Sequence, residues 1–399
     1  MGRQPILLGT LFVEALAFGL VVPVLPEAVA RFSPEPEALA RNLGLFFAVA
    51  AMGQLLGGPL TGGLSDRLGR RPVLLVSLAG TALDAGLMAF APTFWLVLAG
   101  RAVAGLTGAG VACAAASVAD DAPPGERTVR FGRIAAAVSL GVVVGPLVGG
   151  VIARIDPKLP FVVSLGLDLA NLISATLFWH APTRSGGRRR GARPPGALGS
   201  SFASVADLVG RPGAPALIAT FLCVGVAGRA FTSTWALHAT RVFGFAPETL
   251  GLSFALMGLA GVFGQGVLPK PLASILGVAR TVRLGLLMGA MTCASVALAT
   301  TAAQLLAVSL EAGLLGFVGP ILQARLSETT PPENQGTLQG ALSTLSAAGG
   351  LLGPLLFTAL WAASERAPYL VAAAFFVLPL IWTRAADPPP GAFQNRPTA

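Results

Sequence analysis

The stretch Gly62-Gly63-Leu64-Ser65-Asp66-Arg67-Leu68-Gly69-Arg70-Arg71-Pro72 separates two long apolar runs, at 48–61 and 73–91. A connection this short predicts that the helices on either side of it are antiparallel neighbours. Its glycines permit a tight reversal of the chain, and its arginines favour the cytoplasmic side of a membrane. The stretch therefore predicts a loop that joins two membrane-spanning helices.

The composition indicates a chain whose solvent is lipid. Of the 399 residues, 54% are hydrophobic and only 11% are charged, and the mean hydropathy is +0.75. A soluble protein has about 25% charged residues, and a membrane-spanning helix needs about 20 apolar residues. The sequence predicts an all-α membrane protein with twelve such helices, at residues 5–27, 42–62, 72–91, 94–118, 129–153, 158–180, 213–238, 248–268, 276–300, 302–326, 336–362 and 366–384.

The net charge of +9 could suggest a nucleic-acid partner, but the positions of the charges argue against one. Most of the 27 lysines and arginines lie in predicted loops on the same side as the N-terminus. The positive-inside rule then places both termini in the cytoplasm. We therefore expect a multi-pass protein of the inner membrane, with the lipid bilayer as a partner and no nucleic acid.

The chain divides into two similar halves. We expect a six-helix bundle at 1–180, a basic cytoplasmic linker rich in glycine and proline at 181–212, a second six-helix bundle at 213–384 and a polar tail at 385–399. The pattern G-x-x-x-G-P occurs in each half, and the segment 268–277 looks like a degenerate copy of the opening stretch. These repeats predict two bundles related by a pseudo-two-fold axis. Close helix packing is expected at the small residues and prolines of the repeated pattern, namely Gly141, Gly145, Pro146, Gly149, Gly349, Gly353 and Pro354.

Ionisable side chains inside predicted spans mark a candidate transport pathway, because each costs several kcal/mol in lipid unless it faces a cavity or a partner. A rise of ~1.5 Å per residue places Asp84 ~18 Å from the cytoplasmic side and Arg101 ~10 Å from the outer side. In a core of ~30 Å these depths nearly coincide, so we predict an Asp84–Arg101 pair or a shared water cavity. The proposed substrate and proton pathway consists of Glu14, Gln54, Asp84, Arg101, Asp168, Asn171, Arg229, Glu311 and Gln323. The alternative is that these charges only pair structurally and orient the helices.

The opening stretch also has the features of a gate. A helix N-terminus attracts a carboxylate, and the eleventh predicted span begins near Gln335 on the cytoplasmic side. We expect Asp66 to dock there and to latch an outward-open state, with Arg70 and Arg71 holding Asp66. The predicted gating loop comprises Gly62, Asp66, Arg67, Gly69, Arg70 and Arg71.

The pattern G-x-L-S-D-R-x-G-R-R between the second and third spans resembles the loop signature of the major facilitator superfamily. Longer stretches are similar to tetracycline-resistance efflux proteins, at 64–80 followed by Asp84, and at 100–105, 335–340 and 353–359. This resemblance implies export of a divalent-metal chelate of tetracycline in exchange for protons. It also implies that Mg²⁺ travels with the drug, that no cofactor is tightly bound, and that the protein is a monomer. The G-x-x-x-G-P pattern is associated with antiport exporters in this superfamily.

The resemblance assigns roles to individual residues and also has gaps. Asp84 matches the family's carboxylate in span three, Arg101 its arginine in span four, and Gln54 a polar pocket residue, while Glu14 stands where the family usually has aspartate. Gly261 and Gly289 replace a histidine and an aspartate that are tied to metal–drug binding or proton coupling in the family. Arg229 and Glu311 are charges that the family does not lead us to expect, and they form either a new pair or part of a site for another substrate.

Three classes of function therefore compete. The first is a proton-driven exporter of tetracycline or a related amphipathic drug, and the second is a facilitator or exporter of another antibiotic or a metabolite. The third, a membrane sensor that transports nothing, is disfavoured by the intact gating stretch. An ATP-driven pump is excluded within this chain because its two lysines, Lys158 and Lys270, both follow proline, so a Walker A motif is absent. The sequence has neither a nucleophile–base set nor a metal-ligand cluster, so we predict no enzyme and no metal site.

Overall fold

The computed structural model describes residues 3–33, 35–113, 127–179, 205, 210, 214–328, 330 and 335–383. Most of the linker expected at 181–212 and the whole tail expected at 385–399 lie outside these ranges. The described chain is helical, without strands. The helices of the first half are α1 (Arg3–Val21), η1 (Val22–Val24), α2 (Leu25–Ala30), α3 (Pro36–Leu68), α4 (Arg70–Phe90), α5 (Phe94–Thr107), α7 (Arg127–Ala153) and α8 (Leu159–Phe178).

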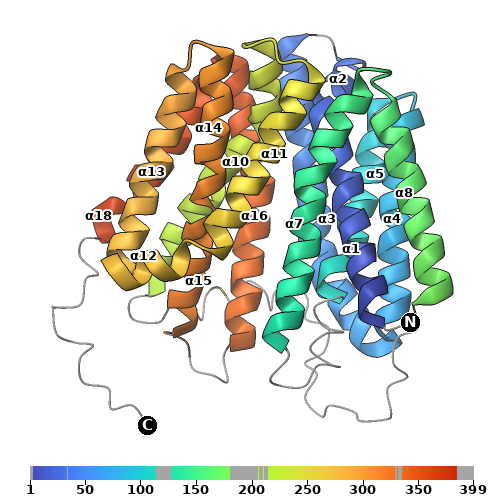
Figure 1. Cartoon of the computed structure of the whole chain (residues 1–399), viewed down its shortest axis with the longest axis horizontal. Helices are drawn as coiled ribbons and strands as arrows, with labels where there is room; N and C mark the ends of the chain where they lie inside the picture. The colour runs from blue at the N-terminus through green and yellow to red at the C-terminus, as the bar shows by residue number, and fades with distance from the viewer. Residues whose placement is uncertain are drawn as a thin grey trace.

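The second half repeats this arrangement of long helices (Figure 1). Its helices are α10 (Ala214–Arg241), α11 (Pro247–Gly266), α12 (Pro269–Leu276), α13 (Val278–Leu298), α14 (Ala302–Leu314), η2 (Leu315–Phe317), α15 (Val318–Glu328), α16 (Gln335–Ala363), α17 (Ala367–Val377) and α18 (Leu380–Thr383). Eleven helical segments in the described ranges are long and apolar enough to cross a membrane, and the shorter apolar segment Ala367–Thr383 follows them. The expected all-α architecture with twelve crossings is confirmed.

The stretch from Gly62 to Pro72 is not a loop, so the prediction of a loop was wrong. Helix α3 continues to Leu68 and α4 begins at Arg70, which leaves Gly69 as the only non-helical residue between them. Gly69 has φ 96°, a backbone conformation that favours glycine. Gly277, which joins α12 to α13, has φ 77°. The expected similarity between residues 62–72 and 268–277 therefore holds at the glycine that reverses the chain.

The repeated glycine pattern packs equivalent helices together in the two halves. A Cβ atom on Gly145 of α7 would lie 2.7 Å from the Cα atom of Gly19 in α1. A Cβ atom on Gly353 of α16 would lie 2.7 Å from Cγ of Arg229 in α10. Between the bundles, α7 contacts α11 and α16 contacts α3. Equivalent helices of the two halves therefore make equivalent contacts, as a pseudo-two-fold arrangement requires.

Among the described residues, the buried apolar cluster that combines both bundles lies at one end of the molecule. Because the number of crossings is even, the first helix begins and the last helix ends on the same side. We call this side the terminal side and the opposite side the far side. At the far side one buried cluster combines residues of both bundles, including Leu25, Leu43, Leu237 and Trp361. On the terminal side each bundle has its own cluster, represented by Leu7, Leu74 and Ile134 in the first and by Ile218, Leu326 and Leu342 in the second.

An ion pair adds to the far-side contact between the bundles. The Nε atom of Arg154, just after α7, lies 3.6 Å from Oε1 of Glu248 in the first turn of α11. A carboxylate in the first turn of a helix is also favoured by the helix dipole. Apolar packing and this ion pair thus join the bundles at the far side.

Candidate functional site

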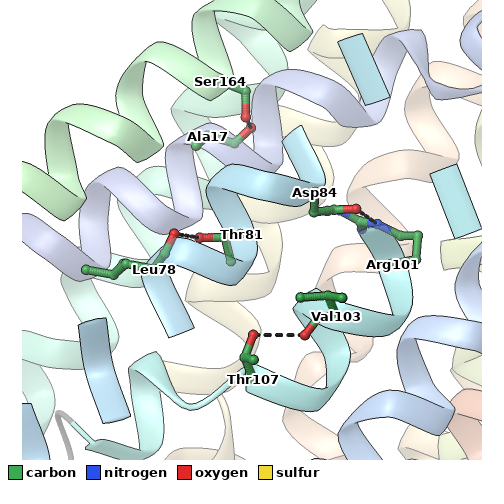
Figure 2. Close-up of polar contacts among 8 residues, drawn as sticks. All are labelled: Ala17, Leu78, Thr81, Asp84, Arg101, Val103, Thr107 and Ser164. Carbon is green, nitrogen blue, oxygen red and sulfur yellow. Dashed lines mark hydrogen bonds and ion pairs between the residues drawn. The ribbon is translucent and has the colours of Figure 1, made fainter. Parts of the chain in front are cut away.

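A buried ion pair between Asp84 and Arg101 lies within the first bundle (Figure 2). Arg101 Nε donates to Asp84 Oδ1 at 2.8 Å, and Arg101 Nη2 contacts Asp84 Oδ2. The two parallel contacts give the fork geometry in which guanidinium and carboxylate bind most strongly. The Arg101 side chain is 12% exposed and the Asp84 side chain is 3% exposed. The pair predicted from the depths of the two residues is confirmed.

Phe46 of α3 covers this pair, a contact that the sequence analysis missed. The Cζ atom of Arg101 lies 4.7 Å from the centre of the Phe46 ring, a cation–π arrangement. Phe46 is buried, and its ring meets that of Phe47 edge to face at 5.3 Å. The pair is therefore fixed by three helices, α3, α4 and α5. A single aromatic residue in an apolar helix gives no sequence signal that would distinguish it from ordinary core packing.

A double-mutant cycle tests the contribution of Phe46. We expect Phe46→Leu to lower the free energy of unfolding, with about 2 kcal/mol of the loss depending on Arg101, because the cation–π contact is shielded from water. In an Arg101→Gln background this share of the loss should disappear. Phe47→Leu, which makes the same substitution at the next residue, should show no coupling to Arg101. Equal losses from Phe46→Leu in both backgrounds would refute the contact.

Glu14 lies on α1 opposite an interruption in the fourth span. Helix α5 ends at Thr107, and the chain resumes a helical course at Gly110. The Ala109 N–H donates to the Ser77 hydroxyl at 3.0 Å, which satisfies a backbone group that would otherwise be costly to bury. A Cβ atom on Gly110 would overlap the carboxyl group of Glu14. Glu14 Oε2 is buried and accepts no hydrogen bond in the described structure.

Asp168 and Asn171 are buried on α8, on the side that packs against α1. Asn171 Nδ2 donates to the Thr10 carbonyl at 3.0 Å. This bond gives Asn171 a structural role in joining the two helices, while its predicted place in the pathway remains a prediction. Asp168 interacts electrostatically with Glu14 and with Arg101. The structure thus gathers four of the predicted residues, Glu14, Asp84, Arg101 and Asp168, in the first bundle.

The predicted polar residues of the second bundle do not form an equivalent cluster. Arg229 Nη2 donates to the Ser346 carbonyl at 3.4 Å, and Glu311 is exposed on α14. The suggested Arg229–Glu311 pair was wrong, because the arginine lies along α16 and makes no ion pair with Glu311 in the described structure. Gln323 Nε2 donates to Gln339 Oε1 at 3.1 Å. In the first bundle, Gln54 is exposed on α3.

The described gating residues Arg70 and Arg71 have hydrogen-bond partners on α3 and α8. Arg70 Nη1 donates to the Ser65 hydroxyl at 2.9 Å, and Arg67 is exposed. Arg71 Nη2 donates to the Thr176 carbonyl of α8 at 2.5 Å. This hydrogen bond ties α4 to α8. The predicted contacts of Arg70 and Arg71 with Asp66 lie outside the described residues and stay predictions. The environments of Gly62 and of the Asp66 side chain lie outside the description, although α16 does begin at Gln335 as expected.

The family to which the chain belongs follows from comparison with known proteins. A model of the Major Facilitator Superfamily matches residues 7–354 and 217–398. The chain belongs to the major facilitator superfamily. Among its relatives, the tetracycline resistance protein of class C from Escherichia coli is 32% identical over 395 residues, which cover 96% of this chain and 98% of that protein. The class G protein from Vibrio anguillarum is 34% identical over 354 residues, 89% of each chain.

A solved structure supports the same fold. The crystal structure of the human organic anion transporter MFSD10 matches with a TM-score of 0.68 and 23% identity, and covers 96% of this chain and 98% of that one. Membership of the superfamily indicates a multi-pass membrane transporter of small molecules. The described part of the chain contains no group of three or more His, Cys, Asp or Glu side chains placed to hold a metal ion.

Proposed function

We propose that the protein is a proton-coupled antiporter that exports tetracycline, as its chelate with a divalent metal, or a related amphipathic drug. The names of the relatives and their coverage of nearly the whole chain support drug export. The observation that carries the proposal is the set of acidic groups beside a buried arginine in the first bundle: Asp84 on Arg101, with Glu14 and Asp168 near them. Charges held inside a membrane span are the usual means by which transporters bind protons and polar substrates.

Alternating access accounts for the asymmetry between the two ends of the molecule. By the positive-inside rule, the arginine-rich loops support a cytoplasmic position for the terminal side, and the bacterial relatives support the inner membrane. On this assignment, a conformation joined at the far side admits the drug from the cytoplasm. Release outside requires the far-side contacts to part and the terminal side to close, where Asp66 would dock on α16. Mg²⁺ moves as part of the substrate, no tightly bound cofactor is needed, and one chain suffices.

A second candidate is export of a different antibiotic or metabolite. A Cβ atom on Gly289 would lie 2.6 Å from the ring of Phe376, so this ring occupies the place of a side chain at that position. Gly261 likewise contributes no side chain. The polar residues that the second bundle does offer, Arg229 and Glu311, differ from those that the resemblance implies. These differences favour a changed substrate with the same antiport mechanism.

Proton movement in inside-out vesicles tests the proposal. We expect tetracycline added with Mg²⁺ to alkalinise an acidified lumen, because each drug molecule that enters exchanges for a proton. Asp84→Asn should abolish the response, because the substitution leaves Arg101 charged beside a neutral amide. Vesicles from cells without the protein give the background.

The other outcomes separate the candidates. A response to another compound but not to tetracycline would keep the antiporter and reject the tetracycline substrate. No response across a panel of drugs would reject drug antiport and favour a metabolite facilitator.

A further inference from the structure

Two hydrogen bonds fix how α1 and α8 lie against each other. Ser164 Oγ donates to the Ala17 carbonyl at 3.0 Å (Figure 2), and Asn171 Nδ2 donates to the Thr10 carbonyl at 3.0 Å. The helices are therefore antiparallel. A step of one residue forward along α1 corresponds in depth to a step of one residue back along α8. Position 14 is level with position 167. Glu14 and Asp168 thus differ in depth by about one residue, or ~1.5 Å.

The Asp168 side chain also lies on the face of α8 that packs against α1. Ser164, Asp168 and Asn171 are spaced by four and three residues, so they lie on one face of α8. The outer two bind α1, which places the buried carboxyl group of Asp168 on the α1 side between them. Asp168 makes no ion pair in the described structure. Its electrostatic partners are Glu14 and, at longer range than an ion pair, Arg101.

The remaining charged groups around Asp168 are engaged elsewhere or lie at the helix ends. On α4, Asp84 is bound twice by Arg101, while Arg71 binds the Thr176 carbonyl two turns of α8 away. On α7, the basic residues Arg127, Arg130 and Arg133 lie in the first two turns, on the terminal side. Glu14 is thus the carboxyl group that acts on Asp168, and its Oε2 is itself buried without a hydrogen bond.

We propose that Glu14 and Asp168 share the transported proton, while Asp84 remains the ionised partner of Arg101. Two neighbouring carboxylates in a site with little water cannot both be charged at low cost, and such a pair titrates as one unit. Asp84 is less suited to carry the proton, because protonating it would leave the guanidinium of Arg101 buried without its counter-charge. The inference rests on the proposed function for its use in transport, and it identifies the proton site as a pair of residues on α1 and α8.

Infrared difference spectroscopy of the reconstituted protein, recorded without drug, tests this assignment. A protonated carboxyl group gives a C=O stretching band that shifts in D₂O and disappears as the pH is raised. We expect one such band in the wild type. In Glu14→Gln or Asp168→Asn the band should disappear at a pH lower by about one unit or more, because no neighbouring carboxylate then opposes ionisation of the remaining group. The double variant should lack the band.

Three controls separate this result from a general disturbance of the fold. Asp168→Glu should keep the band. The charge-neutral double variant Asp84→Asn/Arg101→Gln should also keep it, because the Arg101 pair is not the proton carrier. Asp156→Asn, at an exposed position in the far-side loop, should have no effect.

The result is independent of the identity of the drug. A band unaffected by Asp168→Asn, a band still present in the Glu14→Gln/Asp168→Asn double variant, or no titrating band in the wild type would overturn the shared site. A band that behaves as expected in a protein that gives no proton release with any drug would keep the pair and reject the proposed function. Drug-driven proton release together with a band insensitive to Asp168→Asn would keep the antiporter and reject Asp168.

Discussion

Arg101→Gln is expected to abolish transport and to lower the free energy of unfolding by about 3–5 kcal/mol, because it leaves the carboxylate of Asp84 buried without a counter-charge. The Asp84 side chain is 3% exposed, so water cannot compensate for the lost partner. The loss is measured by denaturant titration in detergent micelles, and transport by drug-driven proton release. The structural consequence should be large even if the transported drug differs from tetracycline.

The double variant Asp84→Asn/Arg101→Gln is the matched control. It removes both charges and leaves two neutral amides, so at least half of the lost stability should return, whereas transport should not. If the double variant is as unstable as Arg101→Gln alone, the cost comes from lost packing rather than from an unpaired charge. If Arg101→Gln transports normally, the pair is only structural.

The common level of Asp84 and Arg101 could be predicted because depth follows directly from position along each helix. Both residues lie in long apolar helices joined by a short turn, and the rise per residue of a helix places them at the same level. The contact with Phe46 could not be predicted in the same way, since it depends on how α3 rotates about its axis. The interruption that brings Gly110 against Glu14 also depends on tertiary contacts, such as the hydrogen bond from Ala109 to Ser77.

The error at Gly62–Pro72 has a different physical cause. Hydropathy reports how much of a helix is apolar, whereas a helix can continue into the polar region beside the membrane. Ser65 and Arg70 are hydrogen-bonded to each other at the ends of α3 and α4, where polar residues are compatible with helical backbone. The chain needs only Gly69 to reverse. Likewise, the wrong pairing of Arg229 with Glu311 came from matching charges without knowing which helix faces each of them.

Gly150→Ala is expected to shift the protein away from the conformation joined at the far side. A Cβ atom on Gly150 of α7 would overlap the Pro247 carbonyl and would lie 3.0 Å from Cα of Glu248, both at the start of α11. This contact is between the bundles, so it can be relieved by moving them apart without unfolding either one. Overpacking of this kind costs about 1–3 kcal/mol, and each 1.4 kcal/mol or so changes the ratio of two conformations tenfold.

Spin labels at the far side measure the shift. Asp156→Cys and Glu365→Cys place labels on exposed far-side residues of the two bundles, in a background without Cys113, Cys223 and Cys293. We expect the distance distribution between the labels to move to longer values in Gly150→Ala. Gly132→Ala is a neutral control on the same helix, because a Cβ atom there meets nothing within 4 Å.

Gly149→Ala is the decisive comparison, because it adds the same methyl group one residue away. A Cβ atom on Gly149 would overlap the Leu20 carbonyl of α1, a contact inside the first bundle that no movement between the bundles can relieve. We therefore expect Gly149→Ala to lower the stability of the protein and to leave the far-side distance unchanged. The reverse pattern, or no change in distance in Gly150→Ala, would mean that the α7–α11 contact does not determine closure. The expected pattern would assign two tasks to adjacent glycines: Gly149 holds a bundle together, and Gly150 lets the two bundles meet.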